Sequence, residues 1–93
     1  MLAIEILQPG APEVLCRASQ PVPEAGEGSI LIRVEAAGVN RPDILQRRGL
    51  YPPPPGISSV PGLEIAGEVV HLGKKAARFI VGDRVCARVA GGG

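Results

Sequence analysis

The sequence predicts a small, mainly β domain, folded as a partly open β-barrel with one short helix. Two observations lead to this prediction. Short stretches of alternating apolar and polar residues recur along the chain, and turns rich in glycine or proline separate them. The 93 residues include 13 glycines and 10 prolines, so such turns are frequent. No stretch has the pattern of a βαβ unit, so a nucleotide-binding sheet is not expected in this chain.

Five strands are expected, within residues 2–6, 13–19, 29–38, 63–73 and 84–90. Apolar side chains share one face of each of the first two strands: Leu2, Ile4 and Ile6, and then Val14, Cys16 and Ala18. In the third strand, Arg33 and Glu35 lie on the face opposite the apolar residues, so that face is expected to be wet. Gly67 in the fourth strand indicates a bulge or a close backbone approach. The turn Gly82-Asp83 precedes the last strand.

A short helix with clear start and stop signals is expected in the stretch NRPDILQRRG, residues 40–49. Asn40 is a good N-cap, Pro42 suits the first turn, and Asp43 complements the positive end of the helix dipole. Gly49 supplies a left-handed stop. The four prolines that follow Tyr51 stiffen the return loop, so the helix and this loop form a pre-organised rim.

The totals exclude several classes of protein. A net charge of +1 gives no reason to expect a nucleic-acid or membrane partner. The start lacks the features of a signal peptide, and no apolar run approaches the roughly 20 residues of a membrane span, so we expect a soluble cytoplasmic protein. Cys16 and Cys86, with His71 as their one possible companion, are too few for a zinc site and are expected to be small buried hydrophobes. With aromatic residues at 2%, the core is expected to be thin and the chain to belong to something larger.

Four ordered motifs carry a family resemblance: AAGVNRPD, GLYPPPPG, VPGLEIAGEVV and FIVGDRVCA. Together they resemble the N-terminal, GroES-like domain of the medium-chain dehydrogenase/reductase superfamily, and within it the zinc-independent quinone oxidoreductases. Zinc-dependent alcohol dehydrogenases of that superfamily carry a cysteine and a histidine at the positions of Asn40 and Leu63. The resemblance therefore implies a metal-free reductase, because an amide and a leucine cannot replace thiolate and imidazole on Zn²⁺.

The resemblance also implies roles for single residues. It places Asn40 near the nicotinamide and the quinone, and Tyr51 beside the substrate, as catalytic residues. Arg41 and Asp43 fall with Asn40 on the cofactor side, and Glu64 would be a buried group that orients the site. Simpler alternatives stay open, since Asn40 could be only an N-cap and Tyr51 could pack only on the prolines. Glu64 could be a solvated strand residue on the same face as Glu68.

The resembling enzymes take NADPH, or less often NADH, and reduce quinones or activated alkenes such as alkenals. They continue into a Rossmann domain that holds most of the cofactor, so residues 1–93 would be a substrate-side domain that is incomplete at its C-terminus. We expect the isolated chain to be inactive and full-length members to be homo-oligomers. Two alternatives stay open: a stand-alone GroES-like binding or interaction module, and the front domain of an enoyl reductase.

Overall fold

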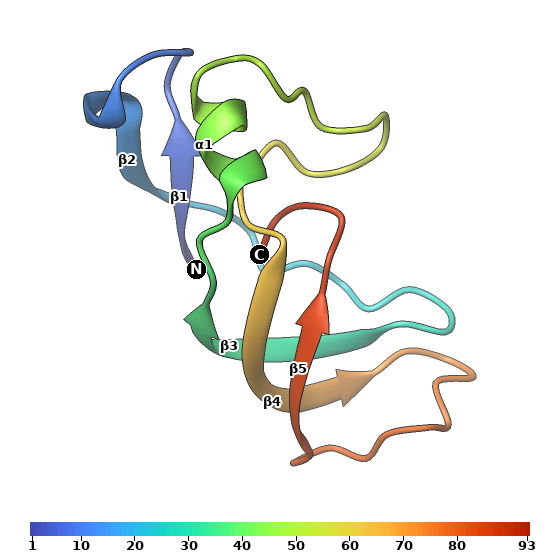
Figure 1. Ribbon diagram of the computed structural model, residues 1–93. Helices are drawn as coiled ribbons and strands as arrows, with labels where there is room; N and C mark the ends of the chain where they lie inside the picture. Colours follow the sequence, from blue (N-terminus) through green and yellow to red (C-terminus); the bar gives the residue numbers. More distant parts are fainter.

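The computed structural model describes residues 1–93 as two antiparallel sheets and one α-helix (Figure 1). The first sheet pairs β1 with β2, and the second has the order β3-β4-β5. The elements are β1 (Leu2–Ile6), the 3₁₀ turn η1 (Pro12–Val14), β2 (Leu15–Ser19), β3 (Ile30–Ala37), α1 (Arg41–Arg47), β4 (Glu64–Leu72) and β5 (Arg84–Arg88). The prediction of a mainly β fold with one short helix is confirmed, although the two sheets stay separate and do not close into a barrel. No helix is long and apolar enough to cross a membrane.

The centre of the three-stranded sheet depends on Gly67 in β4. The register with β3 shifts between Val34 and Ala36, which leaves Glu35 as an extra residue at a bulge. Gly67 pairs with Val34 at this point, and a Cβ atom on it would overlap the carbonyl oxygen of Arg33. Both interpretations of Gly67 from the sequence, a bulge and a close backbone approach, are therefore confirmed.

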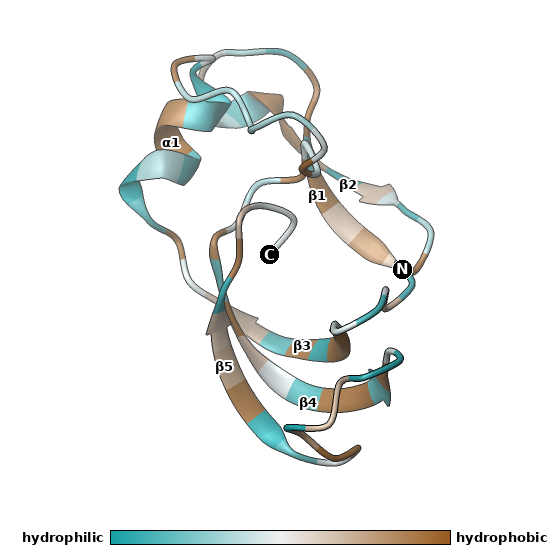
Figure 2. Ribbon diagram, turned by 90° about the vertical axis from the view of Figure 1, so that its right-hand side faces the viewer, coloured by the Kyte–Doolittle hydropathy of each residue, from teal (hydrophilic) through white to brown (hydrophobic).

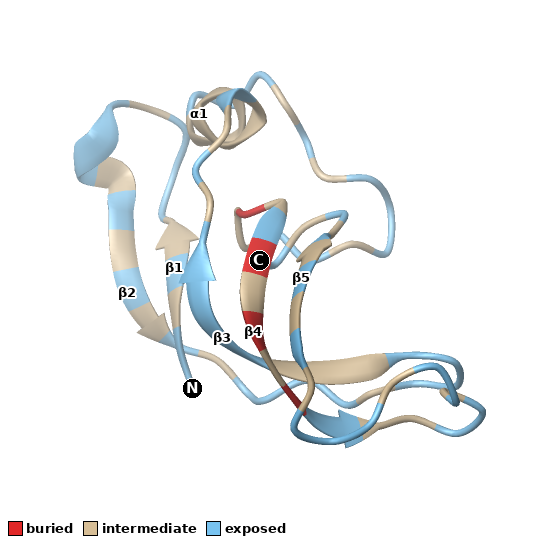
Figure 3. Ribbon diagram, turned by 60° about the horizontal axis from the view of Figure 1, so that its bottom comes forward, coloured by how far each residue is buried: buried red, intermediate tan, exposed pale blue.

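The core is as thin as the composition predicts. Only four residues are buried, and two of them are glycines, Gly62 and Gly67. The buried apolar side chains are those of Ile65 and Val69, with exposed fractions of 8% and 0%. Both belong to β4, where the buried positions are clustered (Figure 3). β4 is the central strand of its sheet, so it alone has a neighbouring strand on each side to cover its residues.

The two-stranded sheet differs in part from the expectation. The register places Leu2, Ile4 and Ile6 opposite Ser19, Arg17 and Leu15, respectively. The apolar faces predicted for the first two strands therefore lie on opposite sides of this sheet. Leu2 and Ile4 have exposed fractions of 74% and 43%, and the apolar character of β1 is visible in Figure 2. The second strand also begins two residues later than expected, because Pro12 starts a 3₁₀ turn.

The predicted helix forms with its expected ends. Asn40 occupies the N-cap position of α1, and Gly49 has a φ of 80°, which makes it the left-handed stop. The end of α1 is tied to the connection between β1 and β2. The N–H of Gly10 donates to the carbonyl oxygen of Arg47 at 2.9 Å, and Nε of Arg47 donates to the carbonyl oxygen of Gly10 at 3.1 Å. These reciprocal bonds fix a helix that is too short to be stable alone.

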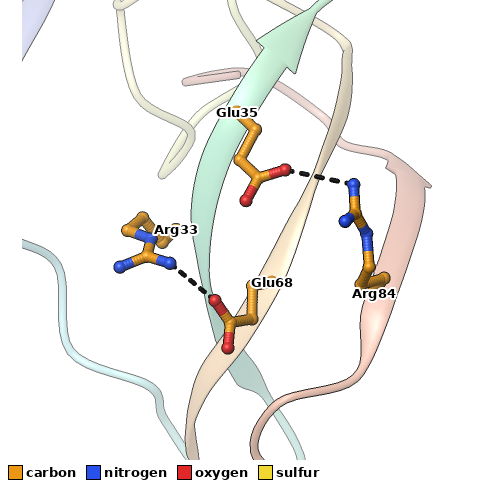
Figure 4. Close-up of polar contacts among 4 residues, drawn as sticks. All are labelled: Arg33, Glu35, Glu68 and Arg84. Atoms are coloured by element: carbon orange, nitrogen blue, oxygen red, sulfur yellow. Dashed lines mark hydrogen bonds and ion pairs between the residues drawn. The ribbon is translucent and has the colours of Figure 1, made fainter.

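One face of the three-stranded sheet is polar, as predicted. Arg33 pairs with Glu68 at 2.6 Å, and Arg84 pairs with Glu35 at 3.4 Å, so charges from all three strands meet on this face (Figure 4). The bulge residue Glu35 reaches across to Arg84 of β5. This last strand ends at Arg88 rather than at the expected position 90. Because both arginines are largely exposed and both glutamates are partly exposed, the pairs add little to stability.

Candidate functional site

A hydrogen bond between Asn40 and Glu64 lies at the centre of the candidate site. Asn40 is presented by the start of α1, and Glu64 is the first residue of β4. Nδ2 of Asn40 donates to Oε2 of Glu64 at 3.0 Å. An ionised carboxylate can only accept hydrogen bonds, so the nitrogen of the amide, rather than its oxygen, must face Glu64. The pair therefore fixes the direction of the amide.

A shallow hollow of about 630 Å³ surrounds this pair. It lies where β4 begins and β5 ends, near the start of α1 (Figure 1). Its lining combines an amide, a carboxylate, a guanidinium and a thiol with small or aliphatic side chains. The lining residues are Asn40, Pro42, Leu63, Glu64, Cys86, Ala87 and Arg88. Such a mixture of apolar wall and a few polar groups suits a small organic ligand.

Asp43 is fully engaged within the fold. Its Oδ2 accepts the N–H of Asn40 and its Oδ1 accepts the N–H of Gly62, both at 2.9 Å. The carboxylate thus joins the start of α1 to the loop that enters β4. By holding both segments, Asp43 sets the separation of Asn40 from β4. Its predicted place on the cofactor side stays a prediction, and its side chain is not part of the lining of the hollow.

The remaining predicted residues lie outside the hollow. Tyr51 is half-buried in the loop after α1, and Arg41 is exposed at the first position of the helix. Neither lines the hollow. The structure therefore brings together Asn40 and Glu64, and leaves the side chains of Tyr51, Arg41 and Asp43 outside the lining of the hollow. Glu64 is exposed rather than buried, although its bond to Asn40 gives it more than the role of a solvated strand residue.

Two residues of the hollow, Cys86 and Arg88, were not among the site residues predicted from the sequence. Arg88 pairs with Glu64 in the β4–β5 register, and Cys86 pairs with Ala66. Cys86 is an exposed free thiol, so the expectation that it is buried was wrong. The reason is the parity of β5, in which Cys86 lies on the same exposed face as Arg84 and Arg88, while Val85 and Ala87 point the other way. That alternation was the available signal, since it groups the thiol with two cations.

The two positions that the resemblance equates with zinc ligands lie on the same hollow. Asn40 and Leu63 both line it, and Glu64 follows directly in the chain. No group of three or more histidine, cysteine, aspartate or glutamate side chains is placed to hold a metal ion. Two side chains in the hollow, Glu64 and Cys86, have ionisable groups that could bind a transition metal. A zinc site usually has three or four protein ligands.

Comparison with known proteins places the chain in a family. Residues 26–92 match the family described as alcohol dehydrogenase GroES-like domain. The chain is 40% identical over 97 aligned residues to the quinone oxidoreductase of Lama guanicoe, covering 99% of this chain and 29% of that protein. The chain thus spans less than a third of the length of this relative.

Solved structures agree with this match. The human synaptic vesicle membrane protein VAT-1 homolog-like protein superposes with a TM-score of 0.86 at 36% identity, over 96% of this chain and 29% of that one. A mycobacterial protein complexed with NADPH superposes with a TM-score of 0.81 at 36% identity, over 96% of this chain and 28% of that one. The family resemblance seen in the four motifs is confirmed, and the chain belongs to the alcohol dehydrogenase GroES-like domain family of the medium-chain dehydrogenase/reductase superfamily.

Proposed function

We propose that this chain is the N-terminal, substrate-side domain of a zinc-free, NAD(P)H-dependent quinone oxidoreductase. The observation that carries the proposal is the bond between Asn40 and Glu64 on the hollow. It supplies a fixed polar group at the position where zinc-dependent relatives of the family hold their metal. The quinone oxidoreductase named among the relatives supports quinones as the substrate class.

The hollow suits the binding and orientation of a flat carbonyl compound. One hydrogen of Nδ2 of Asn40 is used by Glu64, and the other is available for an acceptor such as a quinone oxygen. Leu63, Pro42 and Ala87 supply apolar wall. A fixed donor contributes by holding the acceptor oxygen in one place without reorganising during the reaction.

The donor set argues against zinc in this site. The amide of Asn40 is held by a carboxylate, and the side chain of Leu63 has no lone pair to offer a metal ion. A catalytic zinc ion is usually held by three protein ligands, and two of those positions are occupied here by side chains that do not bind zinc. We therefore propose that reduction here depends on the nicotinamide cofactor alone.

The residues present fit the nicotinamide end of NADPH better than its phosphates. When bound, the nicotinamide supplies a hydride for the reduction of the acceptor. The hollow offers hydrogen-bonding groups to a carboxamide, but the start of α1 is already occupied by the carboxylate of Asp43. A negative side chain at that end disfavours a phosphate group. We therefore expect tight cofactor binding to need residues beyond this chain, and the isolated 93 residues to be inactive.

The other roles predicted from the sequence are part of the same proposal. Tyr51 would contact the substrate from the rim, and Arg41 and Asp43 would lie toward the cofactor. We also propose a cytoplasmic protein that forms homo-oligomers at full length and acts on small quinones or alkenals. The complex of a mycobacterial relative with NADPH supports this cofactor over NADH.

Replacing Asn40 by alanine in the native polypeptide that carries this chain tests the proposal. We expect kcat/KM for a quinone with NADPH to fall about tenfold or more, since a fixed donor is lost. Val39→Ala is the matched control. Val39 is next to Asn40 in the chain and is 81% exposed, so this substitution should leave the kinetics unchanged. Equal kinetics for the two variants would remove Asn40 from the reaction. Separately, micromolar binding of NADPH to the isolated chain would contradict the expected dependence on other residues.

A further inference from the structure

Gly38 lies between the end of β3 and the N-cap of α1, and its Cα lies directly against the side chain of Glu64. We infer that Gly38 is a positioning residue: its missing Cβ leaves the space from which the Glu64 carboxylate holds the amide of Asn40. The inference deepens the proposed function, because it matters for the reaction only if Asn40 acts on the substrate or the cofactor. The contact itself is independent of that role.

The geometry is specific to this glycine. A Cβ atom at Gly38 would lie 2.7 Å from Oε2, 2.9 Å from Cδ and 3.3 Å from Oε1 of Glu64. Oε2 is the same atom that accepts the hydrogen bond from Nδ2 of Asn40. The three atoms nearest to the added carbon all belong to the Glu64 carboxylate. A methyl group at Gly38 would therefore displace the one carboxylate oxygen that orients the amide.

The backbone at Gly38 offers no other reason for a glycine. Its φ lies outside the left-handed region, in contrast to that of Gly49 or Gly62. Its N–H donates to the carbonyl oxygen of Glu64 at 2.9 Å, so the main chains of the two residues are held together. The approach of the carboxylate to position 38 follows from this main-chain contact. The site therefore requires glycine at position 38 because it leaves space for the Glu64 side chain, not because of the backbone freedom of glycine.

The expected effect of alanine at this position is local. The atoms that must move are the far end of a flexible glutamate side chain, which can rotate into solvent because Glu64 is exposed. Rotation costs the fold little but removes the acceptor of the Asn40 amide. The amide would then be free to turn, and its remaining N–H would no longer be held toward one acceptor. Gly38 would thus act on the site through Glu64 and Asn40 in sequence.

The inference can be tested on the chain itself, without cofactor or quinone. Asn40 is the only asparagine, so selective ¹⁵N labelling of asparagine gives one side-chain amide pair in the NMR spectrum. In the wild type we expect this pair to be shifted away from the positions of a solvent-exposed amide. Gly38→Ala and Glu64→Ala should both move it to those positions. Gly26→Ala is the matched control, because a Cβ there would meet nothing within 4 Å, and it should retain the wild-type signals.

A double variant keeps the test decisive if Gly38→Ala lowers stability. If the added methyl acts only through the carboxylate, Gly38→Ala combined with Glu64→Ala should show the same amide pair as Glu64→Ala alone, and a urea midpoint equal to or slightly above it. A further loss of stability in the double variant would overturn the inference. So would a Gly38→Ala spectrum equal to wild type, or a wild-type pair already at solvent-exposed positions. Because the readout needs no turnover, absence of quinone reduction would refute the proposed function and leave this result standing.

Discussion

Replacing Gly67 by alanine tests the contact on which the three-stranded sheet depends. A Cβ atom at this buried position would overlap the carbonyl oxygen of Arg33, and would lie 2.9 Å from the carbonyl carbon of Arg33 and from Cγ2 of Ile32. Two of these three atoms belong to the backbone of β3. They cannot move unless the strand itself shifts away from β4, so the clash must be relieved at the cost of strand pairing.

The magnitude follows from two opposing terms. Overpacking a well-filled position costs about 1 to 3 kcal/mol, and a clash with backbone belongs at the upper end. Alanine also restricts the unfolded chain, which favours folding by about 0.4 to 1 kcal/mol. We therefore expect Gly67→Ala to lower the free energy of unfolding by about 2 kcal/mol. For a domain with two buried apolar side chains, this is a large share of the total stability.

Urea unfolding followed by circular dichroism measures this change. With a slope of about 1 to 2 kcal/mol per molar urea for a small domain, the midpoint should fall by roughly 1 to 2 M. Gly26→Ala is the control, since its Cβ would meet no atom within 4 Å, and its midpoint should stay level or rise slightly. If both variants unfold at the same urea concentration, the close approach of β3 and β4 at the bulge is refuted.

Three further predictions use the same unfolding assay. Val69→Ala should lower the free energy of unfolding by about 2 to 3 kcal/mol, because Val69 is fully buried, whereas Val39→Ala at an 81% exposed position should change little; equal effects would contradict the assigned core. Asp43→Ala should cost about 1 to 2 kcal/mol, since two backbone N–H groups lose their acceptor, and an unchanged midpoint would rule out that bridge. Arg33→Ala should cost less than about 1 kcal/mol, with the difference disappearing in high salt because its pair with Glu68 is exposed; a large, salt-independent loss would indicate a different role.

Local signals predicted the helix better than the strands. Certain residue types are strongly preferred at the ends of a helix, so Asn40 and Gly49 were placed correctly from the sequence. Alternation showed which residues of a strand share a face, but it did not show which face the rest of the chain covers. Leu2 and Ile4 therefore form a regular apolar stripe that is largely exposed. Covering depends on strand register and on distant segments, which alternation does not contain.

The same distinction applies to the candidate site. Asn40 and Glu64 were identified separately, through motifs shared with a family, whereas their hydrogen bond depends on side-chain directions and on the space beside Gly38. Cys86 and Arg88 enter the hollow because β5 pairs with β4 in one register. Another register would have placed different residues of β5 beside Glu64. The sequence alone leaves that register open, so these two residues could not be assigned to the site in advance.

The proposed role of this chain is to serve the substrate side of a quinone reductase. The most direct measurement captures the native polypeptide from its source with an antibody against the loop at residues 51–56, and follows oxidation of NADPH as a quinone is added. We expect oxidation that requires the quinone and saturates with its concentration. A captured polypeptide that neither binds NADPH nor oxidises it in the presence of quinones would contradict the proposed role.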